Sequence, residues 1–180
     1  MPTVVIIAGP NGAGKTTFGD EYLSLSTAER TFEFVNADEI ARGLDAQGIR
    51  ARSDIGAARS MLTRVDELVQ ANADFVVETT LATLAYAQKI PTWRAKGYVV
   101  SLAYLSLGSP EEAIMRVRKR VAAGGHSIPE ATIHRRFGKS LKYFETIYKP
   151  IVDEWYIWES REGTFILVET GNESSHAPRT

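Results

Sequence analysis

Hydrophobic residues occur along this chain in short unbroken runs that alternate with stripes of helical spacing. Runs rich in β-branched and aromatic residues are typical of buried strands, and stripes with residues three or four apart are typical of helices. This alternation predicts an α/β fold with a mainly parallel sheet and helices on both faces. The predicted strands occupy residues 3–8, 32–35, 74–78, 98–105, 155–158 and 164–168.

End signals place several of the helices. The first helix follows residue 15, Ser53 is a candidate cap for a long second helix, and residues 82–90 predict a helix that Pro91 kinks or restarts. Ser109-Pro110-Glu111-Glu112 is a capping box with proline at the first helical position, and Gly124-Gly125 ends that helix. Another helix starts at 127–130. The stripes expected to face the core are Ile55, Ala58, Leu62, Val65 and Val69; Ile114, Val117 and Val121; and Ile133, Phe137, Leu141, Phe144 and Tyr148.

Composition changes this picture little. The chain of 180 residues is expected to form one domain over 1–170, with a flexible polar tail at 171–180. The net charge of −1 argues against recruitment to nucleic acid or to an anionic membrane. No apolar run reaches the roughly 18 residues that a membrane-spanning helix needs. The absence of cysteine is compatible with the reducing cytoplasm, which is the expected location.

The segment between the first strand and the first helix carries the most specific chemistry. Gly9-Pro10-Asn11-Gly12-Ala13-Gly14-Lys15-Thr16 fits the phosphate-loop pattern G-x-x-x-x-G-K-[ST], and Thr17 follows it. Glycines let successive N–H groups point at phosphate oxygens, Lys15 brings a positive charge to the β- and γ-phosphates, and the Thr16 hydroxyl is a ligand for Mg²⁺. The sequence therefore predicts ATP and Mg²⁺ as cofactors, bound at residues 9–17.

Two carboxylates follow predicted strands and are expected at the same edge of the sheet, where ligands of such folds bind. Asp38 is a candidate general base for a substrate hydroxyl, and the alternative is that it only caps the next helix. Glu78 is a candidate for holding Mg²⁺ through water or for binding substrate hydroxyls, and the alternative is a solvated strand end. Thr79 adds a hydroxyl beside Glu78.

A run of cations forms the second strong feature. Arg116 and Arg120 lie one helical turn apart, before the flexible Gly124-Gly125 pair. Arginines at a movable helix end can cover a triphosphate and stabilise transition-state charge, so residues 109–137 are a candidate lid. Arg135 and Arg136 on the next helix have the same potential, and His126 is a candidate substrate contact. The alternative for each arginine is a solvated surface charge.

These residues resemble the zeta-toxin family of phosphate-loop kinases. The resemblance rests on Gly9–Thr16, Asn36-Ala37-Asp38, Glu78-Thr79-Thr80, and the segment from Arg120 through Gly124-Gly125-His126 and Pro129 to Arg135-Arg136-Phe137. It implies a nucleotide- and shikimate-kinase-like fold, phosphorylation of UDP-N-acetylglucosamine on a sugar hydroxyl, and an antitoxin protein as partner.

The resemblance also implies roles for single residues. Lys15 and Thr16 would hold ATP and Mg²⁺, Asp38 would act as the base, and Glu78 would lie at the substrate. Arg120 and one of Arg135 or Arg136 would contact the phosphates. The overall prediction is an ATP-dependent kinase of a small molecule, with Asp38, Lys15, Arg120 and Arg136 as catalytic residues.

Two alternatives remain open at this point. One is a different phosphotransferase, acting on an antibiotic, a sugar acid or a nucleic-acid 5′-hydroxyl, although the near-neutral charge argues against a polynucleotide. The other is a nucleotide-dependent switch that phosphorylates no substrate. A base facing the γ-phosphate distinguishes a kinase from such a switch.

Overall fold

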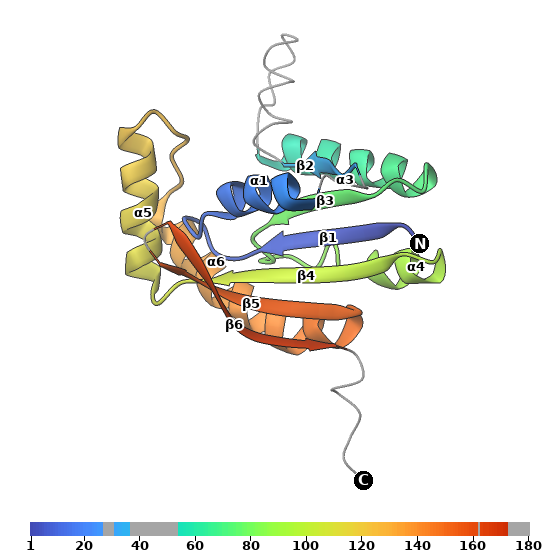
Figure 1. Ribbon diagram of the computed structural model, residues 1–180. Coiled ribbons are helices and arrows are strands. Elements are labelled where there is room, and N and C mark those ends of the chain that lie inside the picture. Colours follow the sequence, from blue (N-terminus) through green and yellow to red (C-terminus); the bar gives the residue numbers. More distant parts are fainter. Residues whose placement is uncertain (27–30, 37–53, 162, 173–180) are drawn as a thin grey trace.

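A six-stranded sheet forms the centre of the computed structural model, which describes residues 1–26, 31–36, 54–161 and 163–172 (Figure 1). The strand order is β2-β3-β1-β4-β5-β6, in which all neighbours are parallel except the last pair, β5 and β6, which form an antiparallel hairpin. The strands are β1 (Thr3–Ala8), β2 (Glu33–Val35), β3 (Phe75–Thr79), β4 (Val99–Ser106), β5 (Glu154–Arg161) and β6 (Thr164–Asn172).

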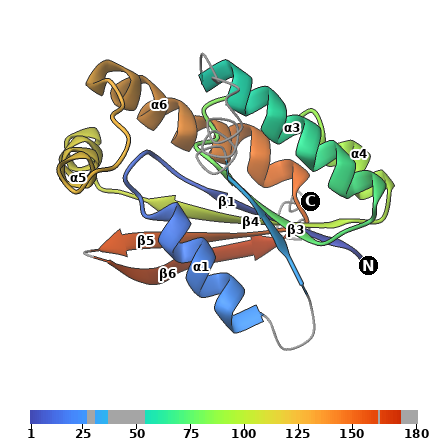
Figure 2. The same ribbon diagram turned by 90° about the horizontal axis from the view of Figure 1, so that it is seen from above.

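The helices cover both faces of the sheet. Helix α1 (Lys15–Ser26) lies on one face, whereas α3 (Asp54–Gln70), α4 (Ile90–Ala95) and α6 (Glu130–Tyr143) lie on the other (Figure 2). Helix α5 (Pro110–Ala122) lies beyond the carboxyl ends of the parallel strands (Figure 1). A π-helical turn (Phe144–Tyr148) and a 3₁₀ turn (Lys149–Ile151) continue α6 toward β5. The observed alternation confirms the predicted α/β class.

Strand β1 explains why its sequence is apolar without interruption. Val4 and Ile6 belong to the core between the sheet and helices α3 and α4, whereas Val5 and Ile7 belong to the core beneath α1 and α5. Successive side chains of a strand point to opposite faces, so a strand covered on both sides needs apolar residues at every position. The phosphate-loop segment therefore starts from a strand that is buried from Val4 to Ala8.

The predicted helix over residues 82–90 is wrong. Residues 83–89 form bends and turns, and the helix begins only at Ile90, with Pro91 in its first turn. A side chain supplies part of the hydrogen bonding there, because the Tyr148 hydroxyl donates to the Thr83 carbonyl (2.8 Å) and accepts from the Ala87 N–H (3.3 Å). Pro91 has no N–H and a fixed φ, which favours the first turn of a helix over its interior.

Some predicted core positions are also wrong. In α3, Ala58 is exposed and the buried row runs through Met61, Val65, Leu68 and Val69. In the later helices Val121 is 37% exposed and Leu141 is 46% exposed. Ser140 faces inward in place of Leu141, because its hydroxyl is hydrogen-bonded to the buried Tyr104 hydroxyl (3.1 Å).

The remaining end signals agree with the sequence. The Ser109 side chain accepts a hydrogen bond from the Glu112 N–H (3.2 Å), as a capping box requires. Gly124 follows α5 with a φ of +91°, a conformation that favours glycine. Strand β6 extends through Asn172, two residues into the predicted tail, and the candidate cap Ser53 lies outside the described residues.

Candidate active site

The phosphate-loop segment, residues 9–14, joins the end of β1 to the start of α1. Gly9, Gly12 and Gly14 have φ values of +143°, +82° and +82°, which side chains disfavour. A Cβ at Gly9 would lie 2.3 Å from the Leu105 carbonyl oxygen, and one at Gly12 would lie 3.0 Å from the Ala113 carbonyl oxygen. Glycine is thus required both by the turn and by the close approach of β4 and α5.

Lys15 lies inside this loop with only 7% of its side chain exposed. Its ammonium group donates to the Pro10 carbonyl (3.1 Å) and lies 3.9 Å from Glu78 Oε1. Helix α1 has no acidic residue in its first turn, so the positive end of its dipole adds to the lysine charge. Among the described residues, the buried Oδ1 of Asn11 has no hydrogen-bond partner. A glycine cradle, a buried cation and an unsatisfied polar atom together fit a polyphosphate group.

Glu78 connects three elements at the carboxyl edge of the sheet. Its Oε2 accepts a hydrogen bond from the Thr16 hydroxyl at the start of α1 and another from Asn36 Nδ2 after β2, both at 2.8 Å. The strand register explains the meeting, because β3 lies between β2 and β1 and pairs Glu78 with Ile7 and Val77 with Val35. Glu78, with 17% of its side chain exposed, is therefore held within this cluster and is not a solvated strand end.

Asn36 is a site residue that the sequence analysis did not assign. It is only 4% exposed. A polar residue directly after an apolar strand, two positions before a candidate base, was the available signal. Asp38 itself lies outside the described residues.

Thr79 is turned toward its own chain. Its hydroxyl oxygen accepts the Leu81 N–H (3.1 Å), and Leu81 is buried with a φ of +52°. This turn begins directly after Thr79, the last residue of β3.

Arg116 lies between the phosphate loop and the β5 end. Its guanidinium donates to Glu112 (2.6 Å) and to the Ser160 hydroxyl and carbonyl oxygens (both 2.8 Å). A Cβ at Gly12 would lie 3.1 Å from the Cβ of Arg116. These contacts tie α5 to β5 beside the loop, so the predicted nucleotide contact already has a structural role.

The other predicted lid residues lie farther along α5 and α6. Arg120 donates to the His126 carbonyl (3.0 Å), and both residues are exposed. Arg135 is exposed and Arg136 half-buried. In the described part of the chain, no hydrogen bond joins Arg120, His126 or Arg135 to the phosphate loop.

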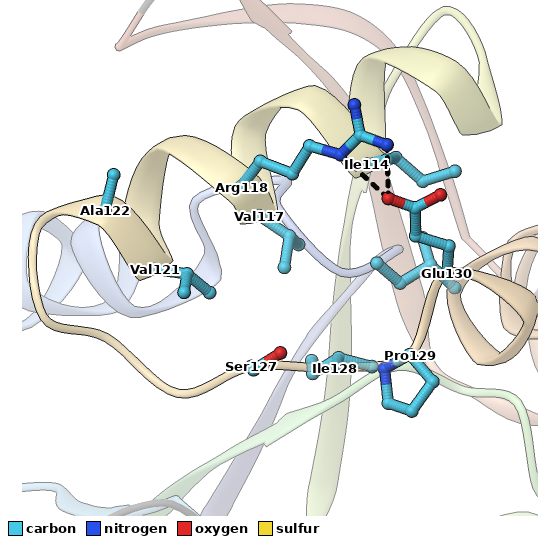
Figure 3. A pocket seen from close by; sticks show the side chains of 10 residues that line it. Ile114, Val117, Arg118, Val121, Ala122, Ser127, Ile128, Pro129 and Glu130 are labelled. Carbon is cyan, nitrogen blue, oxygen red and sulfur yellow. Dashed lines mark hydrogen bonds and ion pairs between the residues drawn. The ribbon is translucent and has the colours of Figure 1, made fainter.

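A cavity of about 450 Å³ separates α5 from α6 within the candidate lid (Figure 3). Its walls are mostly apolar, and the ion pair between Arg118 and Glu130 joins the two helices at one side (Nε–Oε1 2.7 Å). The two helices are therefore not packed at the density of a protein interior along this line. The apolar lining comprises Ile114, Val117, Val121, Ala122, Ile128, Pro129 and Ile133.

Two features are absent from the described ranges, a cluster of metal-binding side chains and a membrane-spanning helix. No group of three or more histidine or acidic side chains is arranged to hold a metal ion there. None of the helices in those ranges combines the length and the apolar character that a bilayer crossing requires.

A strand, a glycine loop closed by lysine and threonine, and a helix, set in a parallel sheet, define a phosphate-loop protein of the class that binds nucleoside triphosphates. A family model described as Zeta toxin matches residues 1–167. The chain belongs to the zeta toxin family, as its motifs had indicated.

Individual relatives extend this comparison. An uncharacterized protein of Haemophilus influenzae is 27% identical over 133 residues, which make up 74% of this chain and 91% of that protein. A structure from the PezAT chromosomal toxin-antitoxin system of Streptococcus pneumoniae has a TM-score of 0.67 at 18% identity, covering 98% of this chain and 73% of that chain. The AvrRxo1-ORF1:-ORF2 complex with ATP gives 0.68 at 17% identity, covering 94% and 58%. At such identities the solved structures show a shared fold, which confirms the predicted phosphate-loop kinase fold.

Proposed function

We propose that this protein is an ATP-dependent kinase that transfers the γ-phosphate to a hydroxyl group of a small molecule. The observation that carries the proposal is the cluster at the carboxyl edge of the sheet, where Lys15, Thr16 and Glu78 converge beside the glycine loop. Family membership supports it, and the AvrRxo1 complex, which shares the fold, was solved with ATP.

The chain's own groups suit such a transfer. The loop N–H groups and Lys15 would hold the phosphates, and Thr16 would hold a Mg²⁺ ion that supplies positive charge to offset the phosphate charge. Glu78 receives the Thr16 hydroxyl proton in a hydrogen bond, which leaves the oxygen lone pairs of Thr16 free to face the metal. Catalysis then consists mainly of positioning and charge neutralisation.

Asp38 is the proposed general base, assigned from its place in the sequence. It follows β2 by three residues, and Asn36 between them contacts Glu78. A carboxylate near that point can accept the proton of the acceptor hydroxyl as it attacks the phosphate. Thr79, Arg135 and His126 remain proposed acceptor contacts.

The single domain is proposed to carry its lid at residues 109–137. The cavity between α5 and α6 leaves room for the helices to approach each other, and Gly124 supplies a turn between them. Among the described residues Arg120 is held by one exposed loop carbonyl, so it can leave that contact for a phosphate oxygen at little cost. Arg136 is the proposed second phosphate contact. Arg116, which ties the middle of α5 to β5, stays a proposed nucleotide contact.

The acceptor and the partner are proposed from the family. UDP-N-acetylglucosamine is the first acceptor to test, and an antitoxin protein is the proposed partner, as the structure from the PezAT toxin-antitoxin system suggests. The reaction is proposed to take place in the cytoplasm, where ATP is abundant.

The decisive experiment incubates the protein with ATP and Mg²⁺, first with UDP-N-acetylglucosamine and then with a metabolite extract. Mass spectrometry is expected to find an acceptor that gains one phosphate in step with ADP formation. Release of ADP and inorganic phosphate with no phosphorylated acceptor in either mixture would contradict the kinase proposal and favour a nucleotide-dependent switch.

A further inference from the structure

Glu78 Oε2 accepts two hydrogen bonds that arrive from different elements. One comes from the hydroxyl of Thr16, in the first turn of α1. The other comes from the side-chain amide of Asn36, the residue directly after β2. The carboxylate is only 17% exposed, and Asn36 is 4% exposed. Such a shielded carboxylate is stable in one orientation only while its donors hold it there.

The direction of these hydrogen bonds has a chemical consequence for Thr16. Because its hydroxyl proton points at Glu78, the oxygen lone pairs point elsewhere, as a metal ligand requires. If the Glu78 carboxylate could rotate, the Thr16 hydroxyl would no longer be held in this orientation. Asn36 Nδ2 limits this rotation, because it donates to the same oxygen atom as the Thr16 hydroxyl.

We infer that Asn36 is a positioning residue for the metal-nucleotide site: its buried amide holds Glu78 against Thr16 and so orients the Thr16 hydroxyl. This inference rests on the proposed function and extends it to a residue that acts through Glu78. Asn36 also ties the end of β2, which leads to Asp38, to the phosphate loop. Hydrogen-bonding partners behind a metal ligand typically change metal affinity or activity by about 10–100-fold when removed.

Calorimetric titration with ATP distinguishes loss of the Glu78 orientation from a general disruption of the binding site. In Asn36→Leu, which keeps the branched side-chain shape and removes the donor, ATP affinity in excess Mg²⁺ is expected to fall about tenfold or more. Affinity in EDTA should change by less than about twofold, because Lys15 and the loop N–H groups still bind the phosphates. Asn36→Ser, whose hydroxyl is too short to reach Glu78, should give the same pattern and serves if the leucine variant does not fold.

Tyr98→Phe is the matched control. It also removes a buried hydrogen-bond donor, since the Tyr98 hydroxyl donates to the Ala73 carbonyl (3.0 Å), but it lies near the opposite end of the sheet, before β4. Its ATP affinity should equal that of the wild type in both media. Equal losses in Mg²⁺ and in EDTA for the Asn36 variants, or no loss in either, would overturn the inference.

A double-mutant cycle tests whether Asn36 acts through Glu78. Glu78→Gln should weaken Mg²⁺-dependent ATP binding by itself, and adding Asn36→Leu to it should cost less than about twofold more, since residues in one network are not additive. Full additivity of the two losses would show that Asn36 acts elsewhere. If the wild type binds ATP without any dependence on Mg²⁺, the proposed function itself fails, which distinguishes that outcome from a failure confined to Asn36.

Discussion

Arg116 and Arg120 lie one helical turn apart on α5, and they differ in a way that a pair of substitutions can measure. Arg116 makes three hydrogen bonds, to Glu112 and to both oxygens of Ser160, with 21% of its side chain exposed. Within the described part of the chain, Arg120 makes one hydrogen bond, to an exposed loop carbonyl. We therefore predict that Arg116→Ala mainly lowers stability, whereas Arg120→Ala mainly lowers kcat.

The size of the Arg116 effect follows from its contacts. Its ion pair with the half-exposed Glu112 contributes little, because solvent screens it. Loss of the guanidinium leaves the buried Ser160 hydroxyl and carbonyl without this donor, and hydrogen bonds to charged groups contribute about 1.5–3 kcal/mol each. Allowing for partial exposure, we expect a loss of about 2 kcal/mol, which for a domain of this length lowers Tm by about 4–8 °C.

Thermal melting and denaturant unfolding of the Arg116→Ala, Arg120→Ala and Lys119→Ala variants provide the assay. Lys119 is an exposed neighbouring cation on α5 and serves as the matched control. The Tm values of Arg120→Ala and Lys119→Ala should lie within about 2 °C of the wild type, as is usual for surface substitutions. A Tm of Arg116→Ala that is equally unchanged would refute the argument that Arg116 anchors α5 to β5.

Three further predictions concern the loop, the base and the lid. Gly12→Ala should weaken ATP binding in calorimetry, because its Cβ would lie 3.0 Å from the Ala113 carbonyl oxygen at a positive φ. Gly138→Ala in α6 is the contrast: open space surrounds this position, so the substitution should raise the free energy of unfolding by about 0.5–1 kcal/mol in denaturant unfolding. Asp38→Asn should lower the phosphorylation rate about 10²–10⁴-fold with ATP affinity unchanged; a loss below about tenfold would mean that Asp38 is only a cap. Arg120→Ala and Arg136→Ala should lower kcat strongly without changing ATP affinity, and retention of more than about half of kcat by both would contradict the lid.

The strands and the phosphate loop could be predicted because their signals are local. A covered parallel strand such as β1 must be apolar at every position, and the loop needs its glycines in a fixed order. The capping box at Ser109 was equally visible, because a single helical turn contains both partners.

Where the prediction failed, distant residues decided the local structure. The segment before Pro91 has helical spacing, but Tyr148, more than 60 residues later, bonds its backbone. Leu141 is exposed because the neighbouring Ser140 faces inward, where its hydroxyl is hydrogen-bonded to Tyr104 on β4.

The same distinction applies to the candidate site: positions set by one segment could be predicted, but contacts between separate segments could not. Glu78 could be placed at the sheet edge from the end of its strand, but not its contact with Asn36, because that depends on β2 and β3 being neighbours. The adjacency of β2 and β3 is a property of the strand order, which no short segment of sequence contains.

Transfer of labelled γ-phosphate is the most direct test of the central claim. Wild-type protein and Lys15→Ala are each incubated with γ-labelled ATP, Mg²⁺ and the acceptor identified by mass spectrometry, and their thermal melting is recorded in parallel. The account predicts transfer by the wild type and no detectable transfer by a folded Lys15→Ala. The reason is that the buried Lys15 ammonium, beside Pro10 and Glu78, is the positive charge that binds the phosphates. Near-wild-type turnover in the folded variant would contradict it.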